Sequence, residues 1–227
     1  MPRATLAKTS SPRLHNMLAR ERLFALLDEG RNRPALWIGG PPGSGKTVLA
    51  ASYAKTNQLP LAWYQLDSGD GELATFFYYF RLATASITKK RRTALPLLAP
   101  EYAADVVSFG RRYFRELSDR LPAQALLVFD NYQEVPTASE FHNVIAAALT
   151  ELPRTINILV TSRVDPPAQF ARALASEHIA LIDSHALQLN LEETISIARL
   201  RGQVDLDVIP IAVRAVRGLG RRFDIVA

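Results

Sequence analysis

The stretch Gly40-Pro41-Pro42-Gly43-Ser44-Gly45-Lys46-Thr47 decides the fold of this chain. It matches the pattern G-x-x-x-x-G-K-[ST] at every fixed position, and such a loop cradles phosphate groups with its backbone amides. Apolar residues 35–38 precede it with the length of a buried strand, and residues 48–55 follow it as a helix. A strand that turns through such a loop into a helix N-terminus concentrates N–H groups on an anion. The sequence therefore predicts a phosphate-binding loop.

Each residue type in this loop has an expected role. Glycines at 40, 43 and 45 permit backbone angles and close approaches that a Cβ atom would block. Lys46 is expected to reach the β- and γ-phosphates of a nucleotide, and the Thr47 hydroxyl is expected to bind Mg²⁺. We expect the whole loop and the following Val48 to line a nucleotide, with ATP or ADP and Mg²⁺ as the cofactors.

A second candidate for the magnesium site is Asp130. It ends the apolar run 125–129, which has the length of a buried strand. Ligands of open α/β sheets bind at the carboxyl ends of the strands, so this carboxylate is expected at the same edge as the phosphate loop. An apolar run that ends in Asp is common, and it gains its meaning here from the loop upstream.

The residues for hydrolysis are less clearly marked than those for binding. Asn131 follows Asp130 and cannot act as a base, whereas Glu134 could either activate a water molecule or lie on a surface turn. Arg163 follows the apolar run 156–161, where it would stabilise or sense the charge of the γ-phosphate, or else pair with a surface acid. We therefore take Lys46, Asp130, Glu134 and Arg163 as the catalytic candidates.

Strand-length apolar runs alternate with helical patterns along the chain. The predicted strands are 35–39, 61–66, 125–130, 156–161 and 179–182, and the predicted helices are 45–56, 72–87, 103–121, 138–152 and 167–175. This alternation predicts an α/β three-layer sandwich around a five-stranded parallel sheet. The pattern is helical only from residue 191, with Asn190 as the expected N-cap. We expect an N-terminal segment with a first helix (1–34), a nucleotide-binding core (35–188) and the start of a small, truncated helical subdomain (189–227).

Composition narrows the class of protein. Hydrophobic residues make up 48% of the 227 residues and charged residues 22%, as in ordinary globular domains. The chain has no cysteine, and no stretch is apolar enough for a signal peptide or a membrane span, so we expect a cytoplasmic protein without membrane partners. The net charge of +5 is spread over separate clusters at 89–92, 111–112 and 221–222, which favours solvated faces over a DNA-binding surface.

The aromatic helix 72–87 and the four histidines carry no chemistry in this interpretation. Leu73, Phe76, Phe77, Phe80, Ala83 and Ile87 form one helical stripe, which is more typical of core packing than of base stacking. The histidines show no metal-ligand spacing, and nothing indicates the acceptor pocket of a small-molecule kinase.

The motifs in order resemble those of STAND-class P-loop ATPases, and more narrowly the nucleotide-binding module of large MalT-like bacterial transcription regulators of the LuxR family. The resemblance spans about residues 5–200 and rests on Arg20-Glu21-Arg22-Leu23, the strand and loop 36–47, Trp63-Tyr64-Gln65-Leu66-Asp67, Leu127-Val128-Phe129-Asp130-Asn131-Tyr132 and Thr161-Ser162-Arg163. It implies that the Thr161 strand lies between the phosphate-loop strand and the Asp130 strand. It also implies that Arg20 lies near the adenine, Asp130 on Mg²⁺ and Arg163 at a sensor position.

The resemblance further implies a regulatory switch, in which the ADP form rests and the ATP form self-associates. Asn131 replaces one of the paired acids common in related ATPases, which indicates slow hydrolysis or, alternatively, a nucleotide-gated interaction module without meaningful hydrolysis. Family members continue into sensor and output domains, and only such an output domain would contact DNA. This sequence ends at Ala227, so an excised module, a truncated product and a stand-alone protein all remain open.

Overall fold

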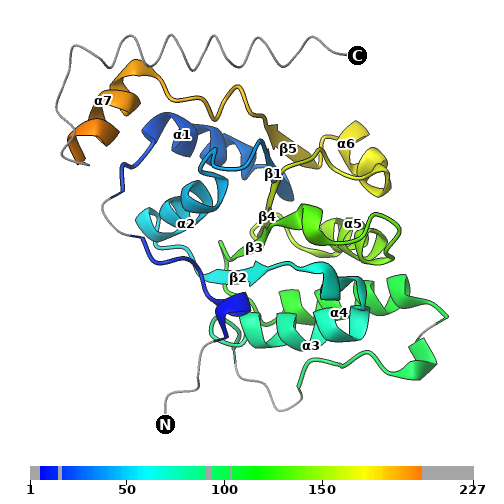
Figure 1. Ribbon diagram of the computed structural model, residues 1–227. Helices are drawn as coiled ribbons and strands as arrows, with labels where there is room; N and C mark the ends of the chain where they lie inside the picture. The colour runs from blue at the N-terminus through cyan, green and yellow to red at the C-terminus, as the bar shows by residue number, and fades with distance from the viewer. Residues whose placement is uncertain (1–5, 15–16, 90–93, 103, 201–227) are drawn as a thin grey trace, which may run out of the picture.

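A five-stranded parallel sheet forms the centre of the computed structural model, which describes residues 6–14, 17–89, 94–102 and 104–200 (Figure 1). Its strands are β1 (Ala35–Gly39), β2 (Leu61–Gln65), β3 (Leu126–Asp130), β4 (Asn157–Ser162) and β5 (Ile179–Ile182). The spatial order is β2-β3-β4-β1-β5, and every neighbouring pair is parallel. The predicted fold class is confirmed, and so is the place of β4, which carries Thr161, between β1 and β3.

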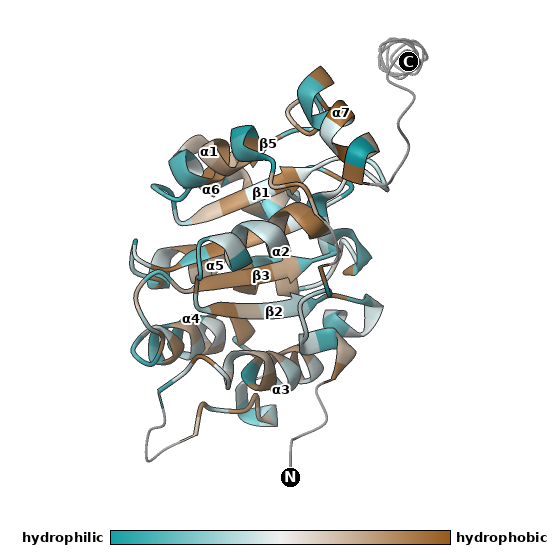
Figure 2. Cartoon of the chain, turned by 90° about the vertical axis from the view of Figure 1, so that its left-hand side faces the viewer, coloured by the Kyte–Doolittle hydropathy of each residue, from teal (hydrophilic) through white to brown (hydrophobic). Residues whose placement is uncertain are grey.

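Strand ends differ by one residue from three of the predicted ranges, because backbone hydrogen bonds and not hydrophobicity define a strand. The N–H of Ala125 bonds to Pro122 O in a turn, so β3 begins at Leu126 instead of 125. The carbonyl of Ser162 accepts from the N–H of Gly40, and β4 covers Asn157–Ser162 instead of 156–161. β2 ends at Gln65 instead of 66. All residues of β3 and β4 are buried, as expected for strands covered on both faces (Figure 2).

Helices cover both faces of the sheet. One face carries α1 (Glu21–Gly30) and α2 (Lys46–Thr56), and the other carries α3 (Leu73–Thr84), α4 (Val106–Ser118) and α5 (Phe141–Glu151) (Figure 1). Leu36 and Ile38 of β1 belong to the core under α1 and α2, whereas Trp37 belongs to the core on the opposite face. The alternation of side chains along β1 therefore divides the interior into two cores.

All five predicted helices were too long, the range 45–56 by one residue because Gly45 is the N-cap of α2. The ranges 72–87, 103–121 and 138–152 are shorter in α3, α4 and α5, and the range 167–175 is a 3₁₀ turn, Ala168–Phe170, followed by the short α6 (Ala171–Ala175). Polar side chains explain two of the new starts. The Asp105 carboxylate caps α4 by accepting from the N–H of Ser108 at 2.9 Å, and the Ser139 hydroxyl accepts from the N–H of Phe141 at 3.1 Å.

The aromatic stripe of α3 packs in the core, as predicted. Leu73, Phe76, Phe77, Phe80 and Ala83 are all buried, and Ile87 is partly buried against the same cluster. Phe76 and Phe80 stack on each other and contact Phe129 of β3. These rings hold α3 to the sheet and leave no free face for a nucleobase.

Helix α7 (Leu191–Leu200) begins where the sequence indicated. Asn190 Oδ1 accepts from the N–H of Glu193 at 2.8 Å, and Glu193 Oε2 accepts from the N–H of Asn190 at 3.1 Å, so the two residues form a capping box. The N-cap prediction is confirmed. The rest of the predicted helical subdomain, residues 201–227, lies outside the described residues. Across the described part of the chain, the helices are too short or too polar to cross a membrane.

Candidate functional site

The loop between β1 and α2 has the backbone of a phosphate cradle. Gly43 and Gly45 have φ angles of +78° and +86°, in the left-handed region that favours glycine, and Gly45 is the N-cap of α2. No heavy atom of the described residues lies within 4 Å of a Cβ built on either glycine, so space is open on both. A Cβ on Gly40 would lie 3.0 Å from Leu187 Cδ1. Glycine is thus favoured at 43 and 45 by the backbone angle and at 40 by close packing against Leu187.

Lys46 lies along the inside of this loop. Its Nζ atom donates to Gly40 O at 2.6 Å, to Pro41 O at 2.8 Å and to Ser44 Oγ at 3.2 Å. Burial and the positive charge of Arg163 lower the pKa of Lys46, while the Asp130 carboxylate acts in the opposite direction. The three oxygen atoms that bind the Lys46 ammonium group are uncharged, so the negatively charged oxygens of a phosphate can replace them.

Asp130 and Thr47 meet at the carboxyl end of β3. Asp130 is 3% exposed, and its Oδ1 atom accepts hydrogen bonds from Thr47 Oγ1 at 2.8 Å and from Thr161 Oγ1. Carboxylate and hydroxyl oxygens are the ligands that Mg²⁺ prefers, so this pair fits the predicted metal. No group of three His, Cys, Asp or Glu side chains in the described residues could hold a metal ion. A Mg²⁺ ion here would need further oxygens from phosphates and water.

Thr161 is a site residue that the sequence reasoning missed. Its hydroxyl donates to Asp130 and accepts from the N–H of Asn131 at 3.2 Å, so it joins β4 to the end of β3. Asn131 has a φ of +61°, a conformation that Asn tolerates better than most residues. The signals in the sequence are a Thr among the apolar residues of a buried strand and its place in the stretch Thr161-Ser162-Arg163.

Glu134 and Arg163 lie at the carboxyl edge of the sheet, as Asp130 does, and are linked through Gln133. The Arg163 N–H donates to Gln133 Oε1 at 3.0 Å, and Gln133 Nε2 donates to Glu134 Oε1 at 3.0 Å. The Glu134 and Arg163 side chains are exposed. The structure thus brings Lys46, Asp130, Glu134 and Arg163 to one end of the sheet, and their catalytic roles stay predictions.

Arg20 is the N-cap of α1. Its Nη2 atom donates to Leu187 O, Gln188 O and Glu193 Oε2, each at 3.0 Å. Arg22 donates to the same carboxylate oxygen at 3.4 Å. Arg20 therefore holds the segment that leads into α7, and its predicted place near adenine stays a prediction. Val48, in the first turn of α2, is 45% exposed beside the loop.

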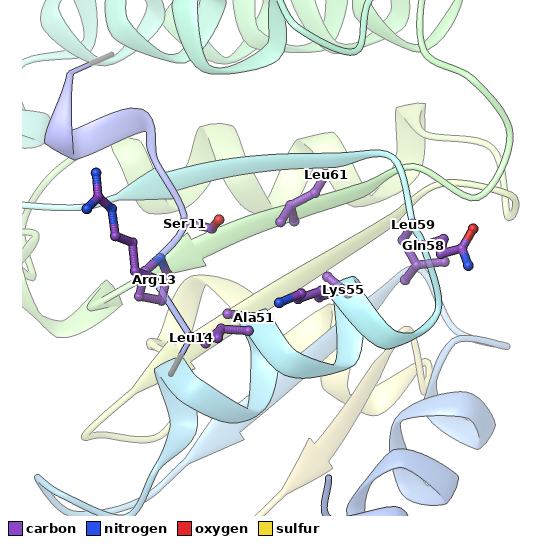
Figure 3. Close-up of a pocket in the computed structure, with 10 residues that line it drawn as sticks. Ser11, Arg13, Leu14, Ala51, Lys55, Gln58, Leu59 and Leu61 are labelled. Atoms are coloured by element: carbon purple, nitrogen blue, oxygen red, sulfur yellow. The ribbon is translucent and has the colours of Figure 1, made fainter. Parts of the chain in front are cut away.

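A cavity in the described part of the chain lies away from this site. It has a volume of about 620 Å³ and is bounded by residues 11–14 and by the far end of α2, including Lys55 and Gln58 (Figure 3). It lies at the opposite end of α2 from Lys46, and none of the predicted site residues lines it.

The arginine cluster at 111–112 is engaged in ion pairs on the surface of α4. Arg111 pairs with Glu151 and Arg112 with Glu116, each at 3.0 Å. Of the other two clusters, Lys90, Arg91 and Arg92 as well as residues 221–222 lie outside the described residues. Arg111 and Arg112 thus pair with acids of α5 and α4, which supports the prediction of solvated faces at this cluster.

Comparisons with known proteins agree with this geometry. The family model described as "Nephrocystin 3, N-terminal" matches residues 15–163. The HTH-type transcriptional regulator MalT of Cronobacter sakazakii is 30% identical over 189 residues, which are 82% of this chain and 21% of MalT. The protein of the same name from Vibrio campbellii is 27% identical over 187 residues, which are 82% of this chain and 20% of that protein.

A solved structure supports the fold independently. A Signal Transduction ATPase with Numerous Domains (STAND) protein with a tetratricopeptide repeat sensor, from Pyrococcus horikoshii, matches with a TM-score of 0.65 and 20% identity over 93% of this chain and 30% of that one. These comparisons confirm the resemblance to a MalT-like STAND module. The chain spans about a fifth of the length of the curated relatives it matches.

Proposed function

Because the chain belongs to the family described as "Nephrocystin 3, N-terminal" and has the fold of P-loop ATPases, we propose that it is the ATP- and ADP-binding switch module of a signal-transducing transcription regulator. We further propose that it hydrolyses ATP slowly. The observation that carries the proposal is the pairing of Thr47 Oγ1 with Asp130 Oδ1 at 2.8 Å beside an open glycine loop. A hydroxyl and a carboxylate so placed form the magnesium side of a nucleotide site.

The residues of the loop supply the binding step. The amides of residues 40–47 and the N-terminus of α2 would hold the phosphates, and Lys46 would exchange the carbonyls of Gly40 and Pro41 for phosphate oxygens. Thr47 and Asp130 would hold Mg²⁺, which neutralises phosphate charge when it is bound. The positive charge of Arg163 would stabilise the γ-phosphate, because Arg163 follows β4, which lies between the strands that lead to the phosphate loop and to Asp130.

Glu134 supplies the proton-accepting group in this proposal. Its carboxylate is exposed at the same edge as Asp130, so water can reach it. A carboxylate within hydrogen-bonding reach of a water molecule takes a proton from it as the oxygen attacks phosphorus. Glu134 is the acidic residue of the turn after β3, since its other residues are Asn131, Tyr132 and Gln133.

The regulatory part of the proposal rests on the relatives. The curated relatives are named as transcriptional regulators, and the chain covers about a fifth of each. We propose that this chain acts in the cytoplasm, that it self-associates in the ATP state, and that DNA is contacted only by an output domain of a longer protein. Residues 35–188 would then form the nucleotide core, with residues 1–34 before it, and α7 would open a helical subdomain that begins at residue 189.

Calorimetry with the full chain tests nucleotide binding. ATP and ADP with Mg²⁺ are expected to bind with micromolar or tighter affinity, and Lys46→Ala should weaken this by about tenfold or more, because hydrogen bonds to charged groups are among the strong ones. Lys55→Ala is the matched control, since it removes the same side chain from the other end of α2. Folded protein that binds no nucleotide, or equal losses in both variants, would contradict the proposal.

A nucleotide-gated interaction module without meaningful hydrolysis is the second candidate, and Asn131 favours it. This residue cannot act as a base, and its N–H is occupied by Thr161 Oγ1. Single-turnover release of phosphate from ATP separates the two candidates. Slow hydrolysis predicts release by the wild type and much less by Glu134→Gln, whereas no release by either protein over hours supports the module without hydrolysis.

A further inference from the structure

Gln133 uses both of its side-chain polar atoms to join two parts of the candidate site. Its Oε1 atom accepts from the N–H of Arg163 at 3.0 Å, and its Nε2 atom donates to Glu134 Oε1 at 3.0 Å. Arg163 directly follows β4, whereas Gln133 and Glu134 lie in the turn after β3. The amide therefore bridges two neighbouring strand ends, one with the cation and one with the carboxylate.

The turn that carries Gln133 is itself held in place. The N–H of Glu134 donates to Asn131 O at 3.0 Å, and the N–H of Asn131 donates to Thr161 Oγ1 at 3.2 Å. Tyr132 is 1% exposed and packs against Trp37 and His142. The backbone on both sides of Gln133 is thus anchored to β4 and to the core, so its side chain reaches Arg163 from a fixed point.

Glu134 needs such a partner if it is to act on water. Its side chain is exposed, and an exposed glutamate moves among many rotamers. A general base works only while it lies within hydrogen-bonding reach of the proton that it takes. The hydrogen bond from Gln133 Nε2 holds one carboxylate oxygen and leaves the other, Oε2, to accept from water.

Arg163 completes the connection to the phosphate loop. Arg163 directly follows β4, which pairs with β1, and Ser162 at the end of β4 accepts from the N–H of Gly40 in the phosphate loop. The positive charge of Arg163 lowers the pKa of Lys46. The backbone of Arg163 is held by Gln133, while its side chain is exposed. One amide thus links the residue after β4, beside the phosphate loop, with the exposed carboxylate of Glu134.

We propose that Gln133 is a positioning residue for ATP hydrolysis, which holds the Glu134 carboxylate against the end of β4 and ties it to Arg163. The inference rests on the proposed function, because it assumes that Glu134 accepts a proton from water. Gln133 contacts neither Lys46 nor Asp130 through any hydrogen bond found in the described residues, so nucleotide affinity should not depend on it.

Steady-state ATP hydrolysis by the full chain with Mg²⁺ tests the proposal. Gln133→Leu removes both polar atoms and keeps most of the volume, and it should lower kcat about three- to tenfold, the usual net effect of one hydrogen bond, with KM within about twofold. In a Glu134→Gln background the same change should have no further effect on kcat, since the carboxylate that Gln133 positions as a base is already gone. Gln169→Leu, in the turn before α6, is the matched control and should leave kcat unchanged.

Hydrogen exchange of the nucleotide-free protein gives a readout that does not depend on activity. In Gln133→Leu the Arg163 N–H loses its acceptor, and its exchange should be about tenfold faster. Gln133→Glu keeps an oxygen for this N–H but loses the donor to Glu134. It should retain slow exchange at Arg163 and still show the reduced kcat, which separates positioning of Glu134 from support of β4.

The possible outcomes distinguish a failure of the proposed role of Gln133 from a failure of the proposed ATP hydrolysis. Hydrolysis by the wild type with unchanged kcat in Gln133→Leu overturns the role of Gln133 and leaves the ATPase intact. Equal losses of kcat from Gln133→Leu in the wild-type and Glu134→Gln backgrounds, or a large rise in KM, show a merely structural effect and also overturn it. ATP binding without phosphate release by the wild type removes hydrolysis itself and the inference with it.

Discussion

Replacing Glu193 by Gln is expected to loosen α7 from the core while the sheet remains folded. The Glu193 side chain is 9% exposed and accepts from Arg20 Nη2 at 3.0 Å and from Arg22 Nη2 at 3.4 Å. The same carboxylate closes the capping box with Asn190. Gln has nearly the same shape and can keep the bond to Asn190, so the change removes chiefly the charge that both arginines share.

The magnitude follows from the surroundings of the carboxylate. Hydrogen bonds to charged groups contribute about 1.5–3 kcal/mol, and removal of one partner from a buried pair costs about 3–5 kcal/mol. Arg22 is 40% exposed and recovers hydration, and Arg20 keeps its bonds to Leu187 O and Gln188 O. We therefore expect a loss near the lower end, about 2 kcal/mol, which corresponds to about thirtyfold in an opening equilibrium.

Amide hydrogen exchange measures this opening residue by residue. In Glu193→Gln the amides of α7 should exchange about thirtyfold faster, whereas those of β3 and β4 should keep their rates. Glu192→Gln is the matched control, because it removes an exposed carboxylate from the same turn of the same helix. If both variants accelerate α7 equally, the effect belongs to helix charge and not to the arginine contacts, and the reasoning is refuted.

Acid should produce the same opening in the wild type. Burial opposes ionisation of Glu193, but the hydrogen bonds from Arg20 and from the Asn190 N–H, with the nearby positive charges, bring its pKa below the usual value of 4.5. A carboxyl group with a lowered folded-state pKa contributes stability above its unfolded pKa and loses it as pH falls. Exchange of α7 should therefore accelerate below about pH 4.5, and Glu193→Gln should lack this step.

Three further changes test the nucleotide site and its supports. Asp130→Asn should abolish the Mg²⁺-dependence of nucleotide affinity in calorimetry with and without EDTA, and full retention of that dependence would exclude Asp130 as a metal ligand. Gly45→Ala should lower the free energy of unfolding by about 1–2 kcal/mol in urea titrations, because a φ of +86° is strained for an L-residue. Gly39→Ala is the control, since Gly39 has no positive φ, and equal losses in the two variants would count against backbone strain. Burial lowers the pKa of His142, so protonation of this residue in the unfolded chain should reduce the stability of the protein as pH falls below about 6.5. In His142→Gln the urea midpoint should therefore depend less on pH between about 7.5 and 5.5, and an unchanged pH dependence would contradict this.

The sequence by itself determined the fold class, the phosphate loop and Asp130. These features are encoded locally: apolar runs define buried strands, and Gly43 and Gly45 mark backbone angles that other residues avoid. The N-cap at Asn190 was predictable for the same reason, since capping joins neighbours in the chain. Helix ends were predicted less well, because a single side-chain bond such as that of Asp105 decides them.

Only the tertiary structure decided which distant side chains meet. Thr161 reaches Asp130 across 31 residues, the N–H of Arg163 reaches Gln133 across 30, and Arg20 reaches Glu193 across 173. Such contacts depend on the order and register of the strands, and the pattern of apolar residues along a chain does not specify which strand lies beside which. The phosphate loop was therefore predictable from the sequence, and the resemblance supplied the place of β4 between β1 and β3. The individual side-chain partners of Asp130, Glu134 and Glu193 were seen only in the tertiary structure.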